Sequence, residues 1–198
     1  MVSALQVVAG IGHLKTITKL SGYRINETES RSLVEDGHVG CDLDEYARDF
    51  SRRHHVPRLS SVDGLFALGN GDLAFVEFKD DKVLESISPR LRFVHNHERC
   101  YEAWIQKKLY DSFIMLHTDY GIKIEDAKKD HVAYIVVAAR KNGMSPGGFS
   151  SRMDRLRANE IEVFKGLHGY LYRHVLLVAP DTFRKTVTPR IDRKSQGE

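Results

Sequence analysis

The sequence predicts one α/β domain in which helices flank a mixed central β-sheet. Three observations support this fold class. Two extended segments meet at an Asn-Gly pair, a long helical stretch follows them, and two apolar runs rich in β-branched residues come later, at 131–139 and 174–180. Because strands and helices alternate in the second half of the chain, we expect a layered fold around the sheet.

The composition sets limits on this prediction. The chain has 198 residues, which is enough for one domain with a substantial core and marginal for two. We therefore expect a single domain over residues 1–198, with its core over about 42–180 and a basic C-terminal tail over 181–198. No window approaches the roughly 18 consecutive apolar residues that a membrane span requires, so a membrane partner is not expected.

Cysteine usage and charge say a little about location and partners. Cys41 and Cys100 are too few for a disulfide framework in a chain of this length. Two buried thiols are typical of a protein in the reducing cytosol, so we expect a cytoplasmic location. The formal net charge of +3 is compatible with a polyanionic partner and does not require one.

The N-terminal region, roughly residues 1–37, is expected to form a helix, a loop and a second helix. Asn26 or Thr28 would cap the second helix, which would run through Val34 and end at Gly37. These are the extra N-terminal helices of the predicted fold.

Residues 42–54 have the pattern of a further helix. Asp42 and Asp44 lie near its start, where the helix dipole favours carboxylates, and Pro57 ends it. This is the first helix of the expected core.

A β-hairpin is expected next. The segments 60–68 and 72–80 are both rich in apolar residues, and Asn70-Gly71 between them is a strong hairpin signal. Side chains alternate along a strand, so Glu77 and Lys79 should point to the same face of the sheet.

The second half predicts two helices and two buried strands. A helix near 90–117 is expected after the hairpin, followed by a central strand at 131–139. A loop at 142–148 should then lead to an amphipathic helix at 151–168. The last element is a buried strand at 174–180, which Pro180 ends. Apolar residues recur every three or four positions along the first of these helices: Tyr101, Trp104, Ile105, Leu109, Phe113 and Leu116. We expect Trp104 in the core and leave Tyr110 open between a core role and base stacking.

Two charges interrupt the otherwise apolar second strand of the hairpin. Burying Glu77 or Lys79 without a partner would be costly, and the tight hairpin brings Asp63 close to Glu77. Two carboxylates held close together repel each other unless a cation lies between them, and their hard oxygen ligands suit Mg²⁺ or Mn²⁺. The alternative is a purely structural ion cluster formed by the three side chains.

These residues match the motif of a known family. Val62-Asp63, thirteen intervening residues and then Glu77-Phe78-Lys79 resemble the PD-(D/E)XK nuclease superfamily, with Val62 in place of the family's proline. The segment from Gln106 to Tyr110 resembles the Q-x-x-x-Y signature of RecB-like members. The resemblance covers about residues 42–140.

The resemblance implies a restriction-endonuclease-like core and a metal-dependent hydrolase that cleaves phosphodiester bonds of DNA. Asp63, Glu77 and the backbone carbonyl of Phe78 would bind Mg²⁺ or Mn²⁺. Lys79 would assist the attacking water, and Gln106 would support the site from the following helix.

The family often adds an acidic residue from the first core helix. Glu45 is our first choice for that role, with Glu29 and Glu35 as alternatives. All three also have an ordinary interpretation as carboxylates on the solvent side of a helix.

Basic and aromatic residues outside the motif are candidates for contacts with DNA. The candidate contacts are Arg52, Arg53, Lys107, Tyr110, Arg184 and Lys185. Because members of the family often form dimers, the resemblance also allows a homodimer.

A second hypothesis keeps the fold without catalysis, as a nucleic-acid-binding or protein-binding module of a mobile-element or defence system.

Overall fold

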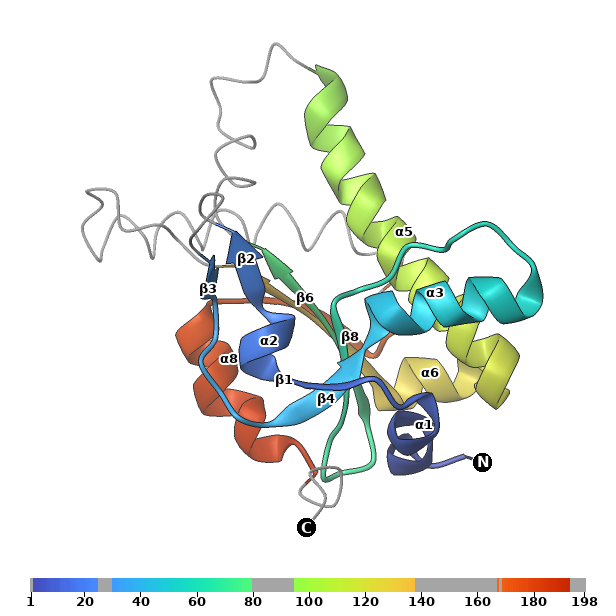
Figure 1. Cartoon of the computed structure of the whole chain (residues 1–198), viewed down its shortest axis with the longest axis horizontal. Coiled ribbons are helices and arrows are strands. Elements are labelled where there is room, and N and C mark those ends of the chain that lie inside the picture. Colours follow the sequence, from blue (N-terminus) through green and yellow to red (C-terminus); the bar gives the residue numbers. More distant parts are fainter. Residues whose placement is uncertain (1, 25–29, 80–94, 138–166, 168, 193–198) are drawn as a thin grey trace.

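The structure, a computed structural model, describes residues 2–24, 30–79, 95–137, 167 and 169–192. Within these residues a six-stranded sheet runs through the centre of the molecule in the order β1-β4-β5-β6-β7-β8 (Figure 1). Its strands are β1 (Leu14–Thr16), β4 (Val39–Asp42), β5 (Gly64–Ala67), β6 (Leu73–Lys79), β7 (His131–Val137) and β8 (His174–Val178). The pairs from β1 to β6 are antiparallel, and β6, β7 and β8 are parallel. The mixed sheet flanked by helices that the sequence predicts is confirmed.

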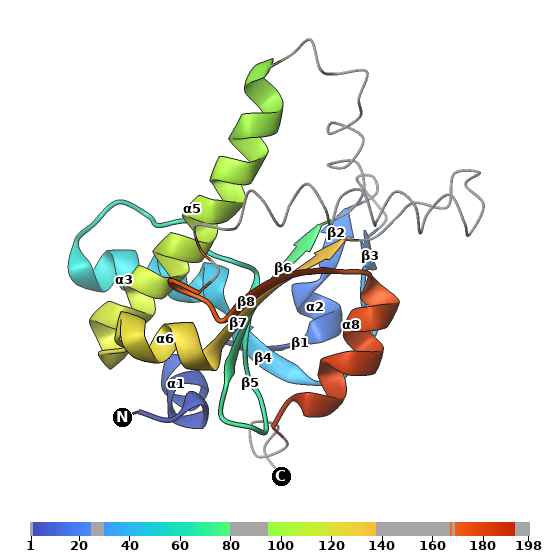
Figure 2. The ribbon, with the colours of Figure 1, turned by 180° about the vertical axis from the view of Figure 1, so that it is seen from behind.

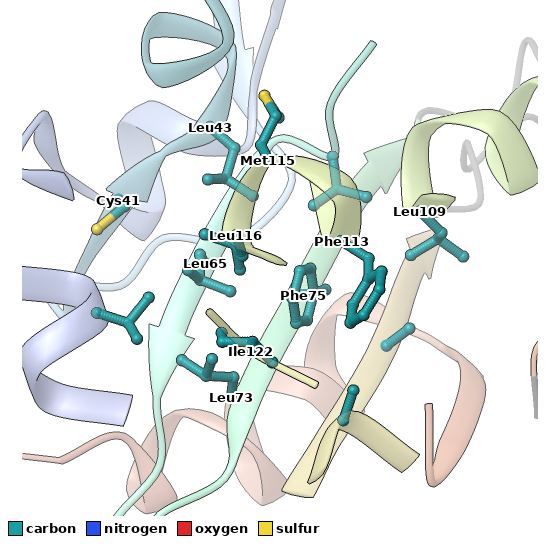
Figure 3. Packing of buried hydrophobic residues seen from close by; sticks show 14 of the residues in the cluster. Cys41, Leu43, Leu65, Leu73, Phe75, Leu109, Phe113, Met115, Leu116 and Ile122 are labelled. Atoms are coloured by element: carbon teal, nitrogen blue, oxygen red, sulfur yellow. The ribbon is translucent and has the colours of Figure 1, made fainter. Parts of the chain in front are cut away.

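One face of the sheet carries four of the described helices (Figures 1 and 2). They are α1 (Ala4–Ile11), α3 (Leu43–His54), α5 (His95–Tyr120) and α6 (Ile124–Asp130). Leu65 and Phe75 from the hairpin share one buried apolar cluster with Leu109, Phe113 and Leu116 of α5 (Figure 3). Burial of each such side chain contributes about 1.5–3 kcal/mol, so this apolar cluster is a main source of stability.

The prediction of an apolar stripe along the long helix is confirmed for four of its six residues. Ile105, Leu109, Phe113 and Leu116 are all buried under α5. Although α5 spans 26 residues, neither it nor another helix in the described part of the chain has the length and apolar character needed to cross a bilayer.

The opposite face of the sheet is covered by α2 (Ile17–Leu20) and α8 (Pro180–Thr186). Phe183 of α8 meets the ring of Phe78 edge to face, with ring centroids 5.8 Å apart. Phe75 lies in the first cluster and Val76 in the second, as alternation along β6 requires. Glu77 therefore faces α5, and the predicted alternation along this strand is confirmed.

The hairpin is confirmed with the expected pairing. Gly64 lies opposite Val76, and Leu65 lies opposite Phe75. Gly71 has φ +87°, a left-handed backbone conformation that glycine adopts without steric cost, which explains its place in the turn.

The N-terminal region differs from the prediction. Residues 30–32, expected within a helix, form strand β3 (Ser30–Ser32), which pairs antiparallel with β2 (Gly22–Arg24). The Ser21 hydroxyl accepts a hydrogen bond from the Val34 N–H at 3.2 Å and donates one to the Val34 carbonyl at 3.1 Å. This long-range pair favours extended chain over a local helix. The candidate caps Asn26 and Thr28 lie outside the described residues.

Of the two later strands, the first lies where the sequence predicts and the second differs from the prediction. β7 is central, with β6 on one side and β8 on the other. β8, expected to be fully buried, lies at the end of the sheet as described, and Leu176 on it is 41% exposed. Pro180 does more than close this strand, because it begins α8, where proline's missing N–H costs no helical hydrogen bond. The loop predicted at 142–148 and the helix predicted at 151–168 lie outside the described residues, except for the buried Leu167.

Gly40 tests how tightly the sheet packs. A Cβ atom at Gly40 would lie 2.2 Å from Cε1 of Phe66, a ring that is itself fully enclosed. Gly40→Ala is therefore expected to lower the free energy of unfolding by about 1–3 kcal/mol, measured by urea denaturation. Gly37→Ala is the matched control, because a Cβ there has no heavy atom within 4 Å. Equal stability of the two variants would contradict this packing.

Candidate active site

Asp63 and Glu77 face each other across the hairpin. Gly64 pairs with Val76 in this antiparallel hairpin. Asp63, just before Gly64, therefore lies opposite Glu77, just after Val76. The Asp63 carboxylate turns back over β6 and accepts a hydrogen bond from the Phe78 N–H, with 2.6 Å between Oδ2 and N. The hairpin register thus places both carboxylates at one end of the two strands.

Two ammonium groups meet these carboxylates. Lys79, two residues along the same strand, forms an ion pair with Oε1 of Glu77. Lys108 reaches in from α5, and its Nζ donates to both Glu77 oxygens at 2.9 Å and lies 3.6 Å from Oδ1 of Asp63. The Glu77 side chain is 1% exposed and that of Asp63 is 20% exposed, so the cluster is largely buried and Asp63 is its most accessible carboxylate.

Trp104 forms a wall of this four-charge cluster. The indole ring centroid lies 4.5 Å from Nζ of Lys79 and 4.4 Å from Nζ of Lys108. Contacts of a cation with an aromatic face are worth about 0.5–2 kcal/mol, and more as water is excluded. Trp104 is 39% exposed, so the prediction that it belongs to the core is wrong. The two lysines draw the indole to the rim of the site.

Burial and charge shift the proton affinity of the site. Burial, followed by the charge of Glu77, raises the pKa of Asp63 to about 7, against the opposing effects of Lys108, Lys79 and the Phe78 N–H. Burial acts to lower the pKa of Lys108, but the carboxylates of Glu77 and Asp63 outweigh it and the pKa is raised. Lys108 is therefore a charged ammonium at neutral pH.

Of the two neighbouring acids on α3, Asp44 rather than Glu45 has a charge that acts on the site. Asp44 accepts a hydrogen bond from the Ser61 hydroxyl at 2.6 Å, and its charge contributes to the raised pKa of Lys108. Glu45 instead pairs with Lys15 at 3.0 Å. Adjacent helix residues point about 100° apart, so the choice between them depends on which face of α3 packs against the sheet.

The other two acids considered for this role are not at the site in the described structure. Glu35 is exposed in the segment between β3 and β4, and Glu29 lies outside the described residues. Neither is therefore seen to join the two hairpin carboxylates.

The residue of α5 that binds Glu77 is Lys108, which the sequence motif did not single out. Gln106 is half-buried and lies two positions earlier, about 200° around the helix axis from Lys108. Tyr110 is 38% exposed. A signal for Lys108 was present in the sequence, because it falls inside the apolar stripe, three residues after Ile105 and directly before Leu109. A lysine in such a position needs a buried partner.

The basic residues considered for DNA contacts are divided between the two faces of the sheet. Arg52 and Arg53 lie on α3 and Lys107 on α5, whereas Arg184 and Lys185 lie on α8 behind the sheet (Figures 1 and 2). Four of them pair with carboxylates, Arg52 with Asp49, Arg53 with Asp119, Lys107 with Asp111 and Arg184 with Asp181. In the described part of the chain these residues do not form one continuous basic surface.

Comparison of the chain with protein-family models, with curated proteins and with solved structures found no match. What the site can do is therefore judged from its own residues. In the described part of the chain, no group of three or more His, Cys, Asp or Glu side chains is arranged to hold a metal ion. Asp63 and Glu77 provide hard oxygen donors, and the ammonium group of Lys108 lies between them.

Glu77 is expected to be the most sensitive charge in the fold. Glu77→Gln removes the charge that balances the buried ammonium of Lys108, and breaking such a pair costs about 3–5 kcal/mol. Urea denaturation should show a loss of this size in the free energy of unfolding. Glu45→Gln is the matched control, since that carboxylate is 34% exposed and pairs with Lys15 near the surface. Similar small losses in both variants would contradict the cluster.

Asp63 should make stability depend on pH in an unusual direction. With its pKa raised from 3.8 to about 7, folded Asp63 keeps a proton that the unfolded chain releases. Its contribution to stability therefore falls as pH rises from about 4 to 7 and is constant above that range. Asp63→Asn cannot ionise, so the variant should gain about 4 kcal/mol relative to the wild type across this window. Urea denaturation at several pH values measures the difference, and parallel curves would contradict it.

Proposed function

We propose that the protein is a divalent-metal-dependent nuclease of the PD-(D/E)XK type that hydrolyses phosphodiester bonds of DNA. The observation that carries this proposal is the convergence of Asp63, Glu77 and Lys79 at one end of the hairpin, where Asp63 keeps partial access to solvent. An acid pair can hold a metal ion that activates water for attack on a phosphate, and an adjacent ammonium can stabilise the charge that develops.

The arrangement of elements around the hairpin supports the same proposal. The antiparallel pair β5–β6 is followed by α5, by the short helix α6 and then by β7, which is parallel to β6. A helix, a hairpin, a helix and a strand in this order are what the resemblance to the superfamily implies for a restriction-endonuclease-like core. The helix before the hairpin is α3.

The donor chemistry of the site fits Mg²⁺ or Mn²⁺. Asp63 and Glu77 offer carboxylate oxygens, and the Phe78 carbonyl is the third ligand that we propose. The Lys108 ammonium, within 4 Å of both carboxylates, indicates that this position attracts a cation. When bound, the ion would polarise the phosphate and lower the pKa of a bound water molecule.

The chain's own side chains would orient the reacting groups. Lys79 is 14% exposed and is held between Glu77 and the Trp104 ring, so its ammonium lies beside the two carboxylates. From there it would position the attacking water or stabilise charge that develops on the phosphate. Gln106 and the exposed Tyr110 on α5, together with Arg52, Arg53 and Lys107, are the candidates for holding DNA near the site.

Lys79 provides the direct test of nuclease activity. Cleavage of single-stranded and double-stranded DNA by the wild type should require Mg²⁺, and Lys79→Ala should reduce the rate by about 10²-fold or more. The exposed Lys128 on α6 gives the control, Lys128→Ala, which should cleave at the wild-type rate. Equal activity of Lys79→Ala and the wild type would refute the assignment.

A specific observation favours one alternative, a binding module that keeps the fold without catalysis. Two ammonium groups, on Lys79 and Lys108, already face the two carboxylates, so the cluster is balanced without a metal. Titration calorimetry with Mn²⁺ separates the two proposals. Binding at millimolar or lower metal concentration supports the nuclease, and its absence supports the module.

A further inference from the structure

Lys108 occupies a position that an unpaired lysine could not. Its side chain is 9% exposed, and its neighbours in the apolar stripe, Ile105 and Leu109, are each 1% exposed. Moving an ammonium group out of water costs several kcal/mol unless charges of opposite sign surround it. The contacts that Lys108 makes must therefore account for its place in the fold.

Those contacts are the ones a bridging cation would make. Nζ of Lys108 is 2.9 Å from each oxygen of Glu77 and 3.6 Å from Oδ1 of Asp63. One positive charge thus lies within 4 Å of both carboxylates, where mutual repulsion is greatest and a cation is most stabilising.

We propose that Lys108 is a built-in counter-ion that holds the cation position between Asp63 and Glu77 and leaves it when a divalent ion binds. This inference rests on the proposed function, because it assigns to the same site a competition between an internal ammonium group and an external metal ion. It makes loading of the site depend on the concentration of free metal.

Electrostatics gives the reason for displacement. Like charges a few ångströms apart repel strongly inside a protein, and a divalent ion repels an ammonium group about twice as strongly as a second ammonium group does. With Lys79 also present, a metal and Lys108 together would exceed the charge of the two carboxylates. Binding of the ion therefore expels the ammonium.

The structure also offers Lys108 a place to go. Its flexible four-carbon stem lets the ammonium move, and the Trp104 ring, 4.4 Å from Nζ and 39% exposed, leads from the buried cluster to solvent. An ammonium group moved outward along this ring would remain beside the metal site, where it could meet a substrate phosphate.

Trp104 is a natural reporter of this movement, because it is the one tryptophan in the chain. Titration of the wild type with Mg²⁺ should change the indole emission as Lys108 leaves the cluster, over the same concentration range in which calorimetry detects binding. Lys128→Met is the matched control, since Lys128 is an exposed lysine on α6, outside the cluster. It should respond as the wild type does.

Lys108→Met removes the competitor while keeping an apolar side chain of similar length. Calorimetry should show Mg²⁺ binding at least 10-fold more tightly than to the wild type, with loss of the Lys108-dependent emission change. Unchanged or weaker Mg²⁺ affinity in this variant would overturn the proposal. If the variant fails to fold, the wild-type titration decides, because Mg²⁺ binding without any change in Trp104 emission would equally overturn it.

The same measurements separate this inference from the proposed function. If Mg²⁺ binds Lys108→Met and not the wild type, Lys108 blocks the position permanently, so its displacement by metal and the proposed function both fail. If Mg²⁺ binds neither protein, the proposed function and the counter-ion role both fail. If Mg²⁺ binds both with equal affinity, only the counter-ion role fails.

Discussion

The buried carboxylate of Glu77 is the constraint on which the arrangement of the site depends. It lies on the central part of the sheet with 1% of its side chain exposed, so its charge must be balanced inside the protein. Lys79 provides one partner from the same strand, and Lys108 provides the other from α5. The pair with Lys108 connects α5 to the hairpin at this point, beside the apolar contacts of the helix. As a result, Trp104 comes to the rim of the cluster, and Asp63 shares the same ammonium.

Stability and orientation have different sources in this fold. The two apolar clusters, one on each face of the sheet, provide the bulk of the stabilisation. A buried ion cluster adds little net stability, since well-packed apolar residues of similar size would often do as well or better. Four charges between the hairpin and α5, in largely apolar surroundings, are therefore better explained by a use for those charges than by folding, and this favours a functional role for the cluster.

Much of the fold could be predicted because its signals are local. Asn70-Gly71 marks the hairpin, the alternation along β6 separates its two faces, and the stripe on α5 identifies the buried side of the helix. The exceptions depend on partners far away in the sequence. Residues 30–32 form a strand because β2 pairs with them, and β8 is partly exposed because of its place at the end of the sheet.

The candidate site, like the fold, has one part that local sequence signals predict and another that depends on distant residues. The sequence by itself determined that Asp63, Glu77 and Lys79 lie at one end of a hairpin, because turn position and strand alternation are properties of a short segment. Only the tertiary structure decided that Lys108 lies between the carboxylates, that Trp104 covers the two lysines and that Asp44 points closer to the site than Glu45. These depend on the rotation of α3 and α5 against the sheet, which is set by packing and charge neutralisation across the whole fold.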